Sequence, residues 1–133
     1  MVRVMIVENS KNPCRSTKKL LSSINYEIVF TTSNGYEAIE KYDTVKPDLL
    51  LLDLDLSKYD GVSVLKEIKK NHPDSKIIII TLHSNTKLLD ECNKFGAHAC
   101  ITIPYNLKDF VTLVTTVCNS PQTKPKVTPV IID

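Results

Sequence analysis

The sequence has little of what marks membrane, fibrous or disulfide-rich proteins. It holds three glycines and no tryptophan in 133 residues, and no apolar run approaches the roughly 20 residues that span a bilayer. Its 17 basic and 15 acidic side chains leave a formal charge of only +2, so net charge gives no reason to expect a polyanion as partner. A hydrophobic content of 42% suits one domain with a buried core, and the chain is short for two.

The four cysteines show neither a metal-binding nor a disulfide pattern. They are Cys14, Cys92, Cys100 and Cys118, and no pair has the CxxC spacing or an accompanying histidine cluster of a zinc site. The first residues run from an apolar stretch straight into Glu8 without a small-residue cleavage site, so no signal peptide is predicted. We therefore expect a cytoplasmic protein with reduced, buried thiols.

Five short apolar runs alternate with five stretches of helical periodicity. Strands are predicted at residues 4–7, 28–32, 49–52, 77–80 and 99–103. The third run is four leucines and the fourth is four isoleucines, as is typical of parallel strands covered by helices on both faces. Five such units predict an α/β fold with a doubly wound, five-stranded parallel sheet, (βα)5.

The last fifteen residues differ from the rest. Residues 1–118 hold all five strand and helix units, whereas residues 119–133 contain three prolines, no helical stripe and an apolar end. We expect residues 1–118 to form the domain. Residues 119–133 are predicted to be a linker or a loosely docked tail, and the apolar end of this segment indicates that it has a packing partner.

Polar side chains follow the predicted strands where ligands of open α/β sheets bind, beyond the carboxyl ends. Glu8 and Asn9 follow the first strand, Asp53 follows the third, and Thr81 ends the fourth. A single acid after a strand is commonly a turn or cap residue. The joint arrangement on successive strands instead predicts a functional site at one edge of the sheet.

A set of short motifs runs in order through the chain. The motifs are Val4-Met5-Ile6-Val7-Glu8-Asn9-Ser10, Pro47-Asp48-Leu49-Leu50-Leu51-Leu52-Asp53, Asp60-Gly61, Ile78-Ile79-Ile80-Thr81, Gly96-Ala97 and Pro104-Tyr105. Each motif is weak alone. Together, over residues 2–118, they resemble the CheY-like receiver domain of bacterial two-component response regulators, which has the flavodoxin-like fold. The resemblance implies a signalling domain in which a histidine kinase or phosphotransfer protein passes a phosphoryl group to an aspartate. Its enzymatic activity would be at most self-catalysed phosphoryl transfer and hydrolysis.

The resemblance also implies roles for single residues. Asp53 would be the phosphoacceptor and Thr81 the hydroxyl that senses the phosphoryl group. Glu8, Asn9, Asp53 and the backbone carbonyl of Asp55 would hold Mg²⁺. A carboxylate is a poor nucleophile that needs a metal to neutralise accumulating charge, and Mg²⁺ needs only one or two carboxylates beside a phosphate.

Partners follow from the same resemblance. The surface of helix four, strand five and helix five would transmit the signal to an output domain or protein. Direct contact with nucleic acid or a membrane is not expected for this domain, and a homodimer stays open. No Gly-rich phosphate loop or nucleic-acid motif is present.

Two departures from the family pattern make this an atypical receiver. Asn9 stands where a second acid is usual, and Ile103 stands where lysine is usual. The two changes cancel in formal charge, but the phosphorylated state lacks an ammonium contact worth roughly 1.5–3 kcal/mol. Lys58 and Lys87, in neighbouring loops, are candidate substitutes. We expect weak Mg²⁺ binding, because one anionic ligand or neighbouring charge is missing.

Two other functions compete with this interpretation. The loss of the lysine and of one acid favours a pseudo-receiver, which has the same fold and binds proteins without being phosphorylated. The segment from Asp53 to Ser57 also resembles the DxDx[ST] motif of haloacid-dehalogenase-type phosphatases, with Asp53 as nucleophile and Asp55 as general acid/base. That motif usually lies on the first strand, whereas here it follows the third.

Overall fold

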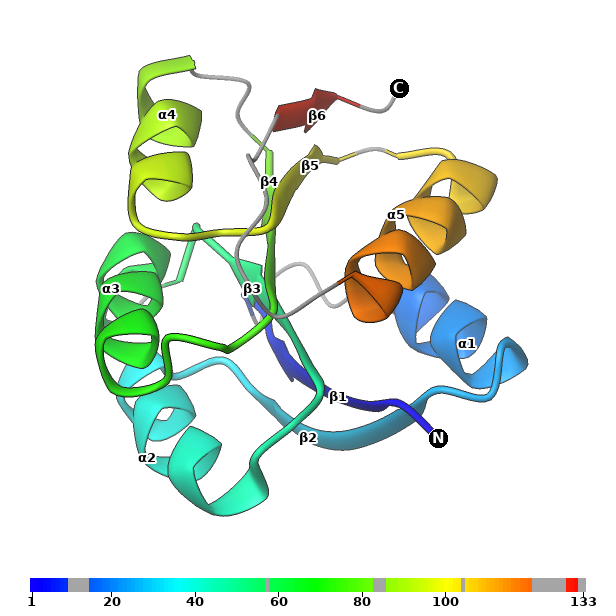
Figure 1. Cartoon of the computed structure of the whole chain (residues 1–133), viewed down its shortest axis with the longest axis horizontal. Helices are drawn as coiled ribbons and strands as arrows, with labels where there is room; N and C mark the ends of the chain where they lie inside the picture. The colour runs from blue at the N-terminus through cyan, green and yellow to red at the C-terminus, as the bar shows by residue number, and fades with distance from the viewer. Residues whose placement is uncertain (10–14, 57, 83–85, 104, 121–128, 132–133) are drawn as a thin grey trace.

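The computed structural model describes residues 1–9, 15–56, 58–82, 86–103, 105–120 and 129–131 (Figure 1). Ser10, Ser57 and Pro104, which belong to the motifs above, and Cys14 lie outside these residues. None of the described helices is long and apolar enough to cross a membrane.

All the described strands form one parallel sheet in the order β2-β1-β3-β4-β5-β6. Their bounds are β1 (Arg3–Val7), β2 (Glu27–Thr32), β3 (Leu49–Asp53), β4 (Ile77–Thr81), β5 (Ala99–Thr102) and β6 (Pro129–Ile131). The five predicted strands are all present, and the doubly wound, CheY-like fold is confirmed. The sixth strand was not predicted: it comes from the segment expected to be a linker or loosely docked tail.

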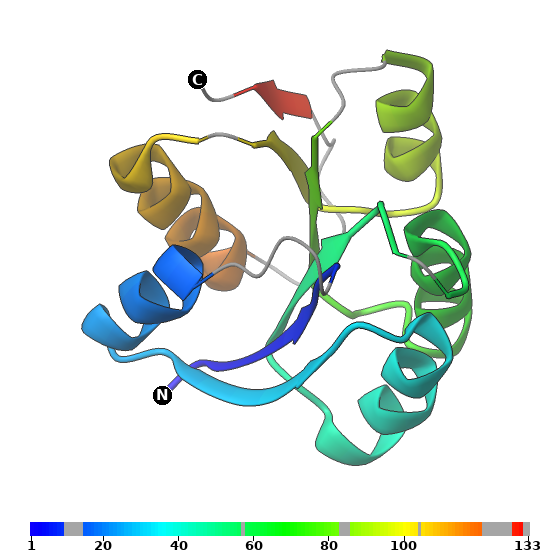
Figure 2. The ribbon, with the colours of Figure 1, turned by 180° about the vertical axis from the view of Figure 1, so that it is seen from behind.

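Helices cover both faces of the sheet, as Figures 1 and 2 show from opposite sides. They are α1 (Arg15–Ser23), α2 (Gly35–Val45), α3 (Gly61–Asn71), α4 (Thr86–Lys94) and α5 (Leu107–Asn119). One core cluster joins the sheet to α1 and α5, and a second joins it to α2, α3 and α4. The leucines of β3 and the isoleucines of β4 are buried because both of their faces are covered.

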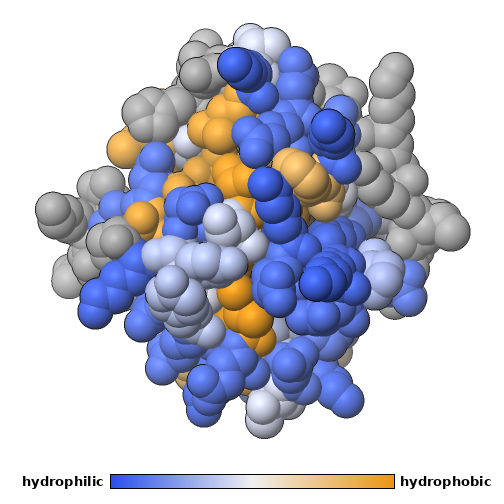
Figure 3. All heavy atoms as spheres, turned by 90° about the vertical axis from the view of Figure 1, so that its left-hand side faces the viewer, coloured by the Kyte–Doolittle hydropathy of each residue, from blue (hydrophilic) through white to orange (hydrophobic). Residues whose placement is uncertain are grey.

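Short polar side chains fix where several helices begin. The Asn34 side chain accepts from the backbone N–H groups of Tyr36 and Glu37, and Asp60 and Asn106 cap α3 and α5 in the same way. These side chains satisfy N–H groups that have no partner within the helix. The outer surface of α2, α3 and α4 is mostly hydrophilic, with apolar atoms showing between the helices (Figure 3).

Two glycines let the loop after β3 lie close to its neighbours. A Cβ on Gly61, the first residue of α3, would lie 2.5 Å from the Asp53 carbonyl oxygen. A Cβ on Gly35 would lie 2.3 Å from the Tyr59 carbonyl oxygen, and the Gly35 N–H donates to the Lys58 carbonyl at 3.1 Å. Any larger residue would push this loop away. The loop that carries Asp55 therefore lies directly against the first residues of α3 and α2.

Candidate functional site

The predicted site residues meet at the carboxyl edge of the sheet. Glu8 and Asn9 follow β1, Asp53 ends β3, and Thr81 ends β4. Because β1, β3 and β4 are neighbours in the sheet, their carboxyl ends come together. We call Glu8, Asn9, Asp53 and Asp55 the acidic centre.

Asp53 is buried and held by backbone amides. Asp53 is only 7% exposed. The Asp55 N–H donates to Oδ1 at 2.8 Å, and the Asn9 N–H donates to Oδ2 at 3.2 Å. Burial raises the pKa of the Asp53 carboxyl above its ordinary value; the two backbone hydrogen bonds oppose this shift, while the charges of Asp55 and Glu8 add to it. The result is an oriented, poorly solvated carboxylate at the end of a rigid strand.

Asn9 contacts the Asp55 carbonyl, which the family resemblance implies as a metal ligand. Its side-chain Nδ2 donates to the Asp55 carbonyl oxygen at 2.5 Å. The side chain of an aspartate at this position has no N–H and could not make this bond, because an ionised carboxylate only accepts. The departure at Asn9 therefore does more than remove a charge: it supplies a donor to a candidate metal ligand.

Lys18 is a charged residue of the site that sequence reasoning missed. Its Nζ lies 2.8 Å from Oε1 of Glu8, and the Glu8 side chain is only 11% exposed. The pair joins α1 to the end of β1. A lysine ten residues after an acid carries no local signal, and the contact exists only because α1 packs back over the sheet. Lys58 and Lys87, the cations proposed from the sequence, are both exposed.

Ile103 packs against the apolar core. It is half-buried against the cluster that joins α1 and α5 to the sheet, and so is Tyr105. The Tyr105 ring stacks on Phe110, with centroids 4.8 Å apart, and its hydroxyl hydrogen-bonds the Thr17 hydroxyl. The Ile103 N–H donates to the Thr81 carbonyl at 2.8 Å. Thr81 is fully buried. Its backbone bond with Ile103 links the end of β4 to the segment that follows β5.

The donor set of the acidic centre fits Mg²⁺ better than a softer metal. It brings together carboxylate oxygens and a backbone carbonyl, which are the ligands of hard cations. In the parts of the chain that the structure describes, no three His, Cys, Asp or Glu side chains converge into a cage for a metal. Mg²⁺ does not need one, because it keeps several waters and uses one or two carboxylates.

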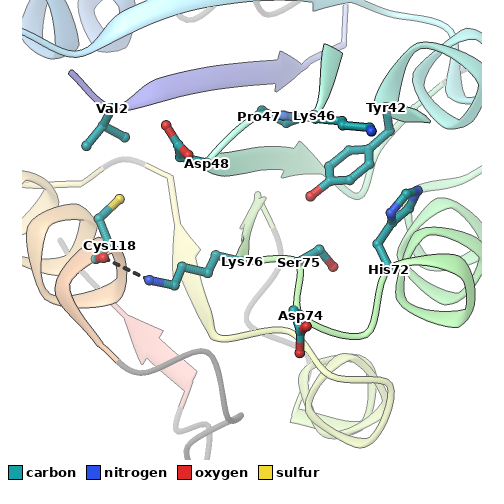
Figure 4. A pocket seen from close by; sticks show the side chains of 10 residues that line it. All are labelled: Val2, Tyr42, Lys46, Pro47, Asp48, His72, Asp74, Ser75, Lys76 and Cys118. Atoms are coloured by element: carbon teal, nitrogen blue, oxygen red, sulfur yellow. Dashed lines mark hydrogen bonds between the residues drawn. The ribbon is translucent and has the colours of Figure 1, made fainter. Parts of the chain in front are cut away.

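The pocket shown in Figure 4 lies at the opposite, amino end of the strands. It has a volume of about 390 Å³ and is lined by residues that include Tyr42, Asp48 and Lys76. Burial raises the pKa of Tyr42 to about 12. Lys76 Nζ donates to the carbonyls of Cys118 and Ser120 at 2.8 and 2.9 Å. The lysine thus binds the last carbonyls of α5 and stabilises that end of the helix.

Comparisons with known proteins agree with the geometry. The family model for the response regulator receiver domain matches residues 4–115. Chemotaxis protein CheY of Thermotoga maritima is 32% identical over 103 residues, 77% of this chain and 86% of that protein. CheY of Listeria monocytogenes is 30% identical over 105 residues, 79% and 88% of the two chains. A chain of the CheX-CheY complex with BeF3 and Mg²⁺ from Borrelia burgdorferi superposes with a TM-score of 0.84 at 25% identity, covering 90% of each chain. With its Asp53 on the third strand of such a fold, the chain belongs to the response regulator receiver domain family of two-component signalling.

Proposed function

We propose that this receiver domain takes a phosphoryl group on Asp53 from a histidine kinase or phosphotransfer protein. The observation that carries the proposal is the Asp53 carboxylate itself: buried, at the carboxyl end of β3, with each oxygen held by a backbone N–H. Such a group is presented in one orientation, which favours in-line attack on a bound phosphorus atom.

The transfer would form one bond and break one. An Asp53 oxygen attacks the phosphorus of phosphohistidine, the P–N bond breaks, and its electron pair returns to the imidazole nitrogen. The product is an acyl phosphate, and later attack of water on phosphorus returns the carboxylate and inorganic phosphate. Mg²⁺, when bound, would supply positive charge to offset the charge on the phosphoryl oxygens. Glu8, Asn9, Asp53 and the Asp55 carbonyl are the residues proposed to hold it.

The remaining polar residues have positioning tasks in this proposal. Lys18 neutralises Glu8 and keeps it beside Asp53 in the absence of metal. Thr81, at the end of the neighbouring strand, would offer its hydroxyl to a phosphoryl oxygen. The signal would leave through α4, β5 and α5 to an output protein or domain.

A pseudo-receiver is the second candidate, because two observations favour it. The Asn9 amide contacts the Asp55 carbonyl, and Ile103 sits in the apolar cluster where the family pattern has a lysine. In that case the domain would bind its partner without accepting phosphate.

Intact mass spectrometry after incubation with acetyl phosphate and Mg²⁺ separates the two candidates. We expect the wild type to gain the mass of one phosphoryl group, and Asp53→Asn to gain none. Asp55→Asn is the matched control: it removes the same charge two residues away and should still be modified. No gain by the wild type, with acetyl phosphate or with a kinase, would leave the pseudo-receiver as the function.

A further inference from the structure

The sixth strand lies on the edge of the sheet that β5 would otherwise expose. β6 runs parallel to β5, with Cys100 opposite Pro129, Ile101 opposite Val130 and Thr102 opposite Ile131. Both ribbon views show it beside β5 (Figures 1 and 2), and it also contacts α4. The segment therefore sits on the face formed by α4, β5 and α5.

The position of α5 indicates that β6 is not simply the next turn of the βα winding. Parallel strands joined through a helix follow a right-handed connection almost without exception. For a strand on the outer side of β5, that rule places the connecting helix on the face of α2, α3 and α4. The helix that precedes β6 is α5, which packs with α1 on the opposite face. β6 is thus added to the edge in the manner of a separate extended peptide.

An edge of this kind is a recognised type of peptide-binding surface. The backbone N–H and C=O groups of an edge strand pair with any extended segment laid beside them, and neighbouring side chains select which segment fits. The described part of β6 is only three residues long, so few hydrogen bonds hold it. A longer strand from another protein could replace it.

We propose that the β5 edge is a binding site for an extended peptide running parallel to β5, and that residues 129–131 occupy it within the same chain. The segment then competes with a strand-forming segment of any partner that docks on α4, β5 and α5. That this face receives the signalling partner rests on the proposed function. Occupation of the edge by residues 129–131 does not.

The Thr102 amide is the natural reporter of this contact. The Ile103 N–H, directly after β5, donates to the Thr81 carbonyl of β4 at 2.8 Å, and N–H directions alternate along a strand. We therefore expect the Thr102 N–H to face β6. Val130→Pro together with Ile131→Pro removes the backbone donors of the segment, whereas Val130→Ala with Ile131→Ala keeps them and serves as the matched control.

The first measurement is hydrogen exchange of the Thr102 amide in the full chain. We expect exchange about tenfold faster in the proline double variant, the factor that corresponds to one lost hydrogen bond, and a much smaller change in the alanine double variant. Equal exchange in the wild type and the proline variant would show that residues 129–131 do not occupy the edge, and would overturn the proposal.

The second measurement uses a synthetic peptide of residues 126–133 as the probe. Added to the ¹⁵N-labelled proline variant at concentrations on the order of millimolar, the effective concentration of a tethered segment, it should shift the β5 amides. The wild type should respond about tenfold less, because its own segment competes. A peptide with the two prolines is the control. If the native peptide shifts no β5 amide of the proline variant, the edge is not an exchangeable site.

Two further outcomes have separate meanings. If the wild type is a dimer in solution and the proline variant a monomer, the segment pairs with a second copy and occupation within one chain is wrong. Phosphorylation of Asp53 should be equal in all these variants. Its absence in all of them would refute the proposed function, and the exchange and peptide results on the edge would still stand.

Discussion

The contact between the Asn9 amide and the Asp55 carbonyl predicts how the metal affinity of this receiver is limited. In Asn9→Asp the Nδ2 donor is lost, and with it the 2.5 Å hydrogen bond to the Asp55 carbonyl. The carbonyl oxygen is then available to bind a metal ion. A carboxylate also takes the place of the amide, beside Glu8 and Asp53. Both changes favour a divalent cation, and we expect the variant to bind Mg²⁺ more tightly than the wild type.

The size of the effect follows from three contributions. Freeing the carbonyl removes a competing hydrogen bond worth about 1 kcal/mol. A better-placed charge at or near a metal typically changes affinity by about 10–100-fold. Against these, a fourth carboxylate raises the negative charge of the acidic centre when no metal is bound, and burial already raises the pKa of Asp53 there. We therefore expect Mg²⁺ binding about tenfold tighter, a difference of about 1.4 kcal/mol.

Isothermal titration with MgCl₂ is the direct assay, because the chain has no tryptophan to report metal binding by fluorescence. Asn9→Ala is the comparison variant: it frees the Asp55 carbonyl, but it also removes the amide proposed to hold the ion and adds no charge, so its affinity should lie well below that of Asn9→Asp. Thermal unfolding gives a second measure, since Asn9→Asp should melt lower than the wild type without Mg²⁺ and recover when Mg²⁺ is added. Equal Mg²⁺ affinity in the wild type and Asn9→Asp would mean that the ion is held elsewhere or not at all, and would refute the reasoning.

Three further predictions concern the same edge of the sheet. Ile103→Lys should enlarge the amide chemical-shift changes that beryllofluoride produces across α4, β5 and α5, because the lysine adds a contact made only with the phosphoryl-like group; large wild-type changes that the lysine leaves as they are would contradict this. Lys18→Met should lower the free energy of unfolding by about 1 kcal/mol in urea titrations, since it removes a cation that lies 2.8 Å from the buried Glu8 carboxylate; Lys19→Met, next to it and exposed, should change little. Asp53→Asn should be more stable than the wild type at neutral pH. The folded state raises the pKa of Asp53 above 3.8, so ionisation of the wild type destabilises it as pH rises above that value; melting curves should converge as pH falls below 3.8, and a gap that persists in acid would contradict the cause.

Local sequence patterns predicted the five-strand core and the sheet edge at which the candidate site lies. The apolar runs 49–52 and 77–80 are short and follow Pro-Asp segments, which favours strands covered on both faces over buried helices, and polar residues directly after such parallel strands are expected at one edge of the sheet. These signals are local, because they depend on the spacing of apolar residues and on which residues directly follow each apolar run. Asp53, Thr81 and Glu8 were found in this way.

Contacts between residues far apart in the chain follow from tertiary packing. The bond from Asn9 to Asp55 and the pair of Lys18 with Glu8 depend on how loops and α1 fold back over the strands, and no spacing rule encodes either contact. The placement of residues 129–131 beside β5 is even harder to predict from the sequence. Strands pair at a sheet edge through backbone groups, which every residue except proline carries alike. Three apolar residues after a proline-containing stretch therefore do not indicate which edge strand they pair with.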